Sequence, residues 1–297
     1  MGGGINLLQD QYYTSSYIYA QLRDATSRVR LILGLSYTSY SDIGTRGQAT
    51  CPKFGLILTP FPGTTVRAAA FQSLKRPLIA DQTIEPTQVA GFTQFFDDIN
   101  GALSTRYGLA VDQRLVPGSN VGFELTKRDV DIPAVGTTYR WQEDQGRAYL
   151  YWPIRGNLQS AGPARWSWAL AAEFQHERLD RPVEFTGDEG FVFVDTTYIP
   201  VTLSAFPGDY LSIQLRTTYV TQRGQRQINE AFPSYDTSTS FWTTDVEVAY
   251  RFPGRRGRLA AGVADLFHGQ HNFAEPDVAH PRFAGGQMAF ARLTLWF

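Results

Sequence analysis

Three of the four histidines lie in one segment, and they are the residues whose types could bind a metal. His268, His271 and His280 fall within HGQHNFAEPDVAH, which also contains Glu275 and Asp277. Imidazole nitrogens and carboxylate oxygens are ligands for divalent transition metals. Two histidines three residues apart have a fixed geometry only on a helix, and this polar segment has no helical pattern. The simpler interpretation is a solvated loop, so we expect neither a metal site nor a cofactor.

The fourth histidine, His176, lies beside a predicted strand and next to Glu173 and Glu177. A histidine with a serine and a carboxylate could make a hydrolase on the wall of a barrel. No motif marks a serine as its partner, and no phosphate-binding glycine loop or paired-cysteine site occurs. We therefore expect no enzymatic activity. A formal net charge of −1 also argues against nucleic-acid binding through a basic face.

A further set of charged residues lies inside segments where apolar and polar residues alternate. Between positions 211 and 216 the apolar residues Leu211, Ile213 and Leu215 alternate with Ser212, Gln214 and Arg216. Side chains of a β-strand alternate between its two sides, so the charges share one side and the apolar groups the other. Five such charges are expected to face the interior of a barrel: Arg106, Glu173, Arg216, Glu247 and Arg292.

The position of these charges distinguishes a soluble sheet from a membrane barrel. A membrane barrel turns its apolar row to lipid and its polar row to the lumen. Here charges of both signs lie in mid-strand on one row, while the other row is almost free of charge. The alternating segments approach the roughly nine to eleven tilted residues that cross a bilayer. Aromatic residues lie near the ends of several apolar rows, as interfacial girdles would: Tyr37, Tyr107, Trp166, Tyr219, Trp242 and Tyr250.

The alternation recurs along the whole sequence and predicts the fold class. We expect an all-β, antiparallel up-and-down transmembrane β-barrel segment of about 13 long strands. The clearest candidate strands are residues 28–38, 103–114, 121–128, 165–175, 211–219, 242–251 and 287–297. Less regular candidates are residues 16–22, 53–59, 65–72, 146–152, 191–203 and 258–267.

The connections between these strands alternate in length. Short ones, several of them containing Pro-Gly, are expected at residues 23–27, 60–64, 116–119, 154–163, 206–209 and 252–257. Long polar loops are expected at residues 39–50, 73–102, 129–145, 176–190, 221–239 and 268–286. Short periplasmic turns and long outer loops are typical of outer-membrane barrels.

The longest loop, residues 73–102, could fold inward as a constriction or outward to contact a ligand. A solvated lid is the expectation. The interior arginines could favour anionic solutes, but opposed carboxylates offer a simpler role for them. We expect cross-strand ion pairs with Asp112, Glu124, Glu173, Asp245 and Glu247.

The last eleven residues, QMAFARLTLWF, form a strand pattern that ends on an aromatic residue. This pattern resembles the terminal signal that the barrel-assembly machinery of Gram-negative outer membranes recognises. Leu293, Leu295 and Phe297 are the residues that would carry this signal.

Two further segments carry a family resemblance. WTTDVEVAYRFP (242–253) and GVADLFHGQH (262–271), followed by the terminal strand, resemble the carboxy-terminal barrel of a TonB-dependent receptor. From residues 52–98 to its end, the sequence is also similar to outer-membrane proteins that carry tetratricopeptide repeats ahead of a receptor-like barrel. The resemblance implies a barrel of about 22 strands with a plug, which takes up siderophores, cobalamin or other scarce nutrients. The TonB complex would be a partner through that plug.

The sequence departs from this family in ways that bear on function. It contains no plug domain and no TonB-contacting segment, and residues 1–13 lack the pattern of a secretory signal. We expect residues 1–297 to form a single barrel domain, incomplete at its amino-terminal end, with an open or imperfectly closed sheet. Its partners would be outer-membrane lipid and the barrel-assembly machinery, in a Gram-negative outer membrane. The expected function is ligand capture and uptake. The alternative is a barrel that anchors a missing upstream repeat domain without transport.

Overall fold

The computed structural model describes most of the chain. The described residues are 12–42, 45–75, 88–93, 100–134, 136–154, 166–182, 191–227, 233–269, 273 and 286–296. They are mainly β-strand, which confirms the all-β prediction, and their helical content is the three-residue 3-10 turn η3 (Pro253–Arg255). No helix among them is long and apolar enough to cross a membrane.

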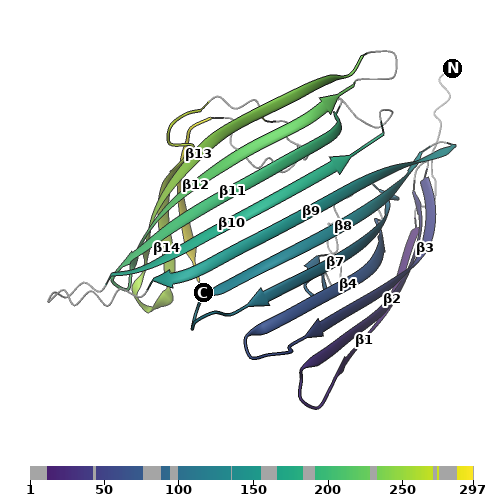
Figure 1. Cartoon of the computed structure of the whole chain (residues 1–297), viewed down its shortest axis with the longest axis horizontal. Coiled ribbons are helices and arrows are strands. Elements are labelled where there is room, and N and C mark those ends of the chain that lie inside the picture. The colour runs from purple at the N-terminus through teal and green to yellow at the C-terminus, as the bar shows by residue number, and fades with distance from the viewer. Residues whose placement is uncertain are drawn as a thin grey trace, which may run out of the picture. The chain divides into compact units, whose positions relative to one another are not determined.

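Thirteen strands form one sheet in which each strand lies beside its neighbour in the sequence (Figure 1). The prediction of about thirteen antiparallel, up-and-down strands is therefore confirmed. The order begins at β1, which pairs with β2, and ends at β15, which pairs with β14. Closure of the sheet into a barrel remains a prediction. The strands are β1 Tyr12–Arg23, β2 Val29–Asp42, β3 Thr45–Leu58, β4 Thr64–Leu74, β7 Leu103–Gln113, β8 Asn120–Ala134, β9 Thr137–Ile154, β10 Trp166–Asp180, β11 Phe191–Pro207, β12 Leu211–Arg226, β13 Tyr235–Arg251, β14 Gly257–Ala264 and β15 Met288–Leu295.

Most strands are longer than the sequence pattern indicated, and they extend into the predicted long loops. β2 and β3 meet inside the predicted loop 39–50, and β8 and β9 meet inside the predicted loop 129–145. β12 and β13 cover most of the predicted loop 221–239. The added residues of β12 and β13 are rich in Thr, Ser, Gln and Arg, so both strand faces are polar there and no alternation marks them. Those three segments are strand hairpins, and the prediction of long loops was wrong for them.

The short connections fall where they were predicted within the described residues. They occupy residues 24–28, 59–63, 114–119, 208–210 and 252–256. In the first of them, Asp24 Oδ1 accepts a hydrogen bond from the Val29 amide at 2.9 Å, and the Thr26 hydroxyl donates to the same carboxylate. The hydrogen bond from Thr26 has the larger effect and the one from Val29 the smaller, and together they hold the pKa of the Asp24 carboxyl below its ordinary value.

This turn should depend on pH. A depressed folded pKa means that the ionised Asp24 stabilises the turn above the unfolded value of 3.8, and that this contribution is lost as the pH falls through the folded pKa. Asp24→Ala should speed hydrogen exchange of the Val29 amide at pH 7, relative to its intrinsic rate. Asp24→Asn, which accepts the same bond without titrating, should remove the pH dependence. Equal protection in wild type and Asp24→Ala would contradict the assignment.

The chain falls into two compact units. Unit 1 contains residues 1–111 and 125–144, and unit 2 contains residues 112–124 and 145–297. Within each unit, the strand registers determine which side chains share a face of the sheet.

In unit 2 the sheet has one apolar and one polar face. Leu215 lies opposite Leu203 and Val246 on the face called here the apolar face. Its neighbour Arg216 lies opposite Thr202 and Asp245 on the polar face. The apolar face is accessible at Leu215, whose side chain is 43% exposed, and no other layer covers it in the described part of the unit.

In unit 1, apolar side chains are exposed on one face while charged side chains are buried on the other. Leu33 pairs with Phe54 on the apolar face, and both side chains are more than 40% exposed. On the polar face, Lys53 is 3% exposed and Arg106 is 6% exposed. Soluble sheets bury apolar side chains and leave Lys and Arg in water. The burial of these four side chains is the reverse.

The polar face of unit 1 carries a small hairpin, β5 (Gln88–Val89) and β6 (Phe92–Thr93). Val89 and Phe92 are fully buried and form a cluster with Phe71 of β4 and Ala110 of β7. This part of the predicted loop 73–102 therefore packs against the sheet. The expectation of a solvated lid was wrong for residues 88–93, while residues 76–87 and 94–99 lie outside the described part.

Two arginines on the polar face of the sheet hold this hairpin through hydrogen bonds to its backbone. Arg67 lies over the Phe92 ring, 5.2 Å from its centroid, and donates to the Ala90 carbonyl at 3.4 Å. Arg106 donates to the Thr93 carbonyl at 3.0 Å. The hairpin turn needs left-handed backbone at Ala90 (φ 50°) and Gly91 (φ 88°).

The hairpin should be displaced by one methyl group on the wall. A Cβ at Gly108 would lie 2.5 Å from ring atoms of Phe92, which is 1% exposed. Gly108→Ala should therefore loosen residues 88–93 and raise their hydrogen exchange, as measured by mass spectrometry of the folded chain. Leu109→Ala, on the opposite face of β7, is the matched control and should leave the exchange unchanged. Unchanged protection in Gly108→Ala would show that the hairpin does not rest on this wall.

Candidate functional site

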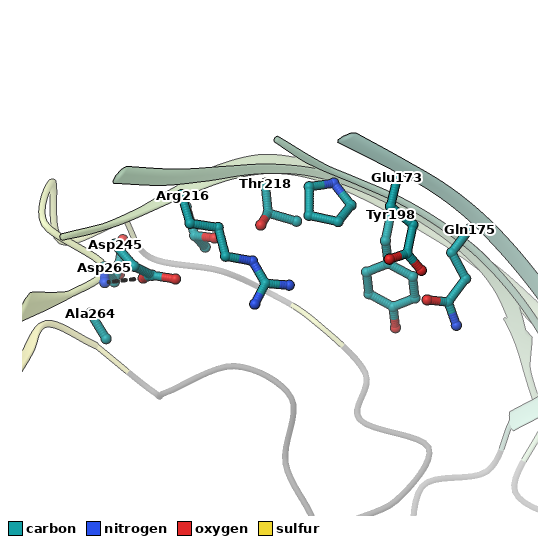
Figure 2. A pocket seen from close by; sticks show the side chains of 10 residues that line it. Glu173, Gln175, Tyr198, Arg216, Thr218, Asp245, Ala264 and Asp265 are labelled. Carbon is teal, nitrogen blue, oxygen red and sulfur yellow. Dashed lines mark hydrogen bonds between the residues drawn. The ribbon is translucent and has the colours of Figure 1, made fainter. Parts of the chain in front are cut away.

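The polar face of unit 2 contains a pocket of about 500 Å³ (Figure 2). Strands β10, β11, β12 and β13 each contribute two residues, spaced two apart, because such residues point to the same face. The end of β14 closes one side. The lining residues are Glu173, Gln175, Tyr198, Pro200, Arg216, Thr218, Thr243, Asp245, Ala264 and Asp265.

Arg216 projects its guanidinium into this pocket (Figure 2). Its Cα partner on β13 is Asp245, which is one of the carboxylates expected to form a cross-strand ion pair. The described part of the chain contains no hydrogen bond or ion pair to Arg216. A guanidinium presents five hydrogen-bond donors in a planar fork, so this side chain can bind a carboxylate or another planar anion from solution.

Asp245 bonds instead to the backbone at the end of β14. Its Oδ1 accepts the Asp265 amide at 3.0 Å, and the Leu266 amide donates to the Thr244 carbonyl at 2.7 Å. Asp265 adopts left-handed backbone (φ 50°), which ends the strand at Ala264, earlier than the predicted 267. The Asp265 side chain is buried.

The opposite side of the pocket is anchored by an ion pair and an aromatic cluster. Glu173 Oε1 accepts a hydrogen bond from Arg147 Nε at 2.6 Å, which is one of the expected cross-strand pairs. The Tyr198 ring packs with Val220, Phe241 and Phe273. These contacts hold the two sides of the pocket, and Arg216 extends between them (Figure 2).

The five charges predicted to face a barrel interior all lie on the polar face of their strands. Glu173 and Arg216 line the pocket together. Glu247 forms an ion pair with Arg258, and Arg292 lies 6.0 Å from the Phe290 ring centroid. Arg106 holds the hairpin of unit 1. That this face is a barrel lumen remains a prediction.

The other candidate residues lie outside the pocket. His268 Nδ1 accepts the Gln287 amide at 3.2 Å, whereas His271 and His280 lie outside the described residues. In the described part, no group of three or more His, Cys, Asp or Glu side chains is arranged to hold a metal. His176 contacts Thr197 (3.0 Å) and Asp195 (3.3 Å) on the apolar side of the sheet.

The proposed assembly-signal residues belong to the last strand. Leu293 and Leu295 are exposed on the apolar face of β15, where Leu293 lies opposite Leu259. Phe297 lies outside the described residues. Nothing in the geometry of β15 bears on recognition by other proteins, so the assembly signal stays a prediction.

Sequence reasoning missed most of the pocket. Tyr198, Gln175 and Asp265 were not singled out, although Gln175 belongs to the same polar row as Glu173. Alternation identifies the row on each strand, but only the register shows which rows meet.

No protein-family model matches the chain, and no curated protein sequence matches it.

The Asp245 contact should stabilise this end of the sheet. Asp245→Ala removes the acceptor of the buried Asp265 amide, and leaving such a group unsatisfied costs about 1–3 kcal/mol. Asp245→Asn keeps an oxygen in place and should cost much less. Urea unfolding of the three proteins in one detergent measures the difference. Equal free energies of unfolding for wild type and Asp245→Ala would rule out this role.

Proposed function

We propose that this chain forms an outer-membrane β-barrel that captures a ligand and passes it across the membrane. The observation that carries the proposal is the inverted distribution of side chains. Large apolar residues such as Leu33 and Leu215 are exposed on one face, whereas on the other Lys53 and Arg106 are buried and Glu173 is paired with Arg147. Lipid is the solvent in which an exposed Leu and Phe surface is stable.

The length of the apolar face in unit 2 supports this proposal. Tyr219 and Trp242 are in ring contact at one limit, with centroids 4.9 Å apart. Tyr210 and Tyr250 are in contact at the other limit, with centroids 6.2 Å apart. Trp242 to Tyr250 spans nine residues of β13, and a tilted strand needs about nine to eleven residues to cross a bilayer. Beyond Trp242 the same face carries Ser240, Ser238 and Asp236, as expected of strand that leaves the lipid.

The pocket supports ligand capture over a purely anchoring barrel. An anchor needs only a stable wall, and a wall is most stable when its interior charges are paired. Arg216 instead extends into open space among other polar groups. The resemblance of residues 242–253 and 262–271 to receptor barrels points in the same direction.

The membrane proposal predicts that the same substitution destabilises the folded chain at one residue of β12 and is tolerated at the adjacent residue. Leu215→Arg places a charge in mid-strand on the apolar face, which costs about 2–4 kcal/mol if that face contacts lipid. Gln214→Arg places the same charge on the polar face opposite Glu247 and should be tolerated. The folded fraction in phospholipid vesicles, read from heat-modifiable migration and urea unfolding, compares them.

The same pair of variants tests the water-soluble alternative. Leu215 is 43% exposed, and surface substitutions in a soluble protein usually change stability by less than about 0.5 kcal/mol. If Leu215→Arg folds as well as Gln214→Arg, the apolar face does not contact lipid and the proposal fails.

A further inference from the structure

The pocket is lined by charged groups of both signs. Glu173, Asp245 and Asp265 supply three carboxylates to its lining. Arg147 is engaged with Glu173, and Arg216 is the one guanidinium that lines the pocket itself. The lining therefore presents carboxylates together with one guanidinium that is directed into the pocket (Figure 2).

This combination of charges restricts the ligand class. An anion would meet Arg216 but would be repelled by neighbouring carboxylates, and a cation would leave Arg216 without a partner. A zwitterion satisfies both signs at once. Arg216 and Asp245 are Cα partners on adjacent strands and both line the pocket, so one small ligand can contact both side chains.

We propose that this pocket binds a free α-amino acid, with its carboxylate on Arg216 and its ammonium group on Asp245. The guanidinium fork matches a carboxylate in a bidentate contact. Asp245 Oδ1 holds the Asp265 amide, and Oδ2 has no hydrogen-bond partner among the described residues, so it can accept from the ammonium group. The inference rests on the proposed ligand capture, for which it names the substrate class.

The remaining walls suit the side chain of the ligand. The Tyr198 ring and Pro200 provide apolar surface, and Thr218 and Thr243 provide hydroxyl groups. A pocket of about 500 Å³ exceeds the volume of the head group and leaves room for side chains of different sizes. It is within the range of about 300–1,000 Å³ that is usual for small-molecule sites.

The first test uses wild-type protein, folded in detergent micelles, and the twenty common α-amino acids as probes. Isothermal titration should detect binding of at least one of them. Its N-acetyl derivative and its carboxamide should each bind at least about tenfold more weakly, since each loses one charged hydrogen-bonding group. Binding of none, or equal binding of the free and both blocked forms, would overturn the proposal without any mutant.

The second test assigns the two charges. Arg216→Gln should weaken binding of the free amino acid at least about tenfold and should affect the carboxamide little. Asp245→Asn should weaken binding of the free amino acid at least about tenfold and should affect its N-acetyl derivative little, because that derivative has no ammonium group. The matched control is Arg292→Gln, which removes a polar-face arginine outside the pocket and should not change the affinity. Unchanged affinity in Arg216→Gln would overturn the assignment.

The outcome separates this inference from the proposed function. A chain that inserts into vesicles but binds no amino acid would overturn the ligand class alone. A chain that binds amino acids in micelles but tolerates Leu215→Arg in vesicles would support the pocket and overturn the membrane proposal.

Discussion

The strand register is the constraint on which the rest of this structure depends. Backbone hydrogen bonds between neighbouring strands fix which residues lie opposite one another, and alternation then assigns each side chain to a face. On β12, a slip of one residue would move Arg216 to the apolar face and Leu215 to the polar face. Every such slip would bring charges to the exposed apolar surface. The apolar face and the polar face therefore specify the register together.

Contacts between neighbouring strands distinguish Arg216 from Arg147 and Arg258. Arg147 meets Glu173 across neighbouring strands, and Arg258 meets Glu247, so both form ion pairs. Arg216 lies opposite Asp245, but the end of β14 presents the Asp265 amide to that carboxylate. Asp245 Oδ1 holds that amide, and the Arg216 guanidinium extends into the pocket (Figure 2).

The sequence predicts the part of the fold that an amphipathic pattern marks. Strand number, order and short turns follow from alternation and Pro-Gly signals such as FPG at 252–254. Strand length does not follow, because β12 and β13 continue through Thr, Gln and Ser where both faces are polar. The hairpin at 88–93 is similarly hidden, since Val89 and Phe92 find their apolar partners only on the folded wall. The pocket depends on contacts between rows of four strands, and no single row reveals it.

The central claim, that the apolar face contacts lipid, can be measured directly. In a Cys51→Ser background, which removes the only cysteine, single cysteines at positions 211 to 216 can carry a fluorophore in the folded chain. Vesicles with brominated acyl chains quench fluorophores that contact lipid. The account predicts strong quenching at positions 211, 213 and 215 and weak quenching at positions 212, 214 and 216. Uniform quenching, no quenching, or the opposite alternation would contradict it.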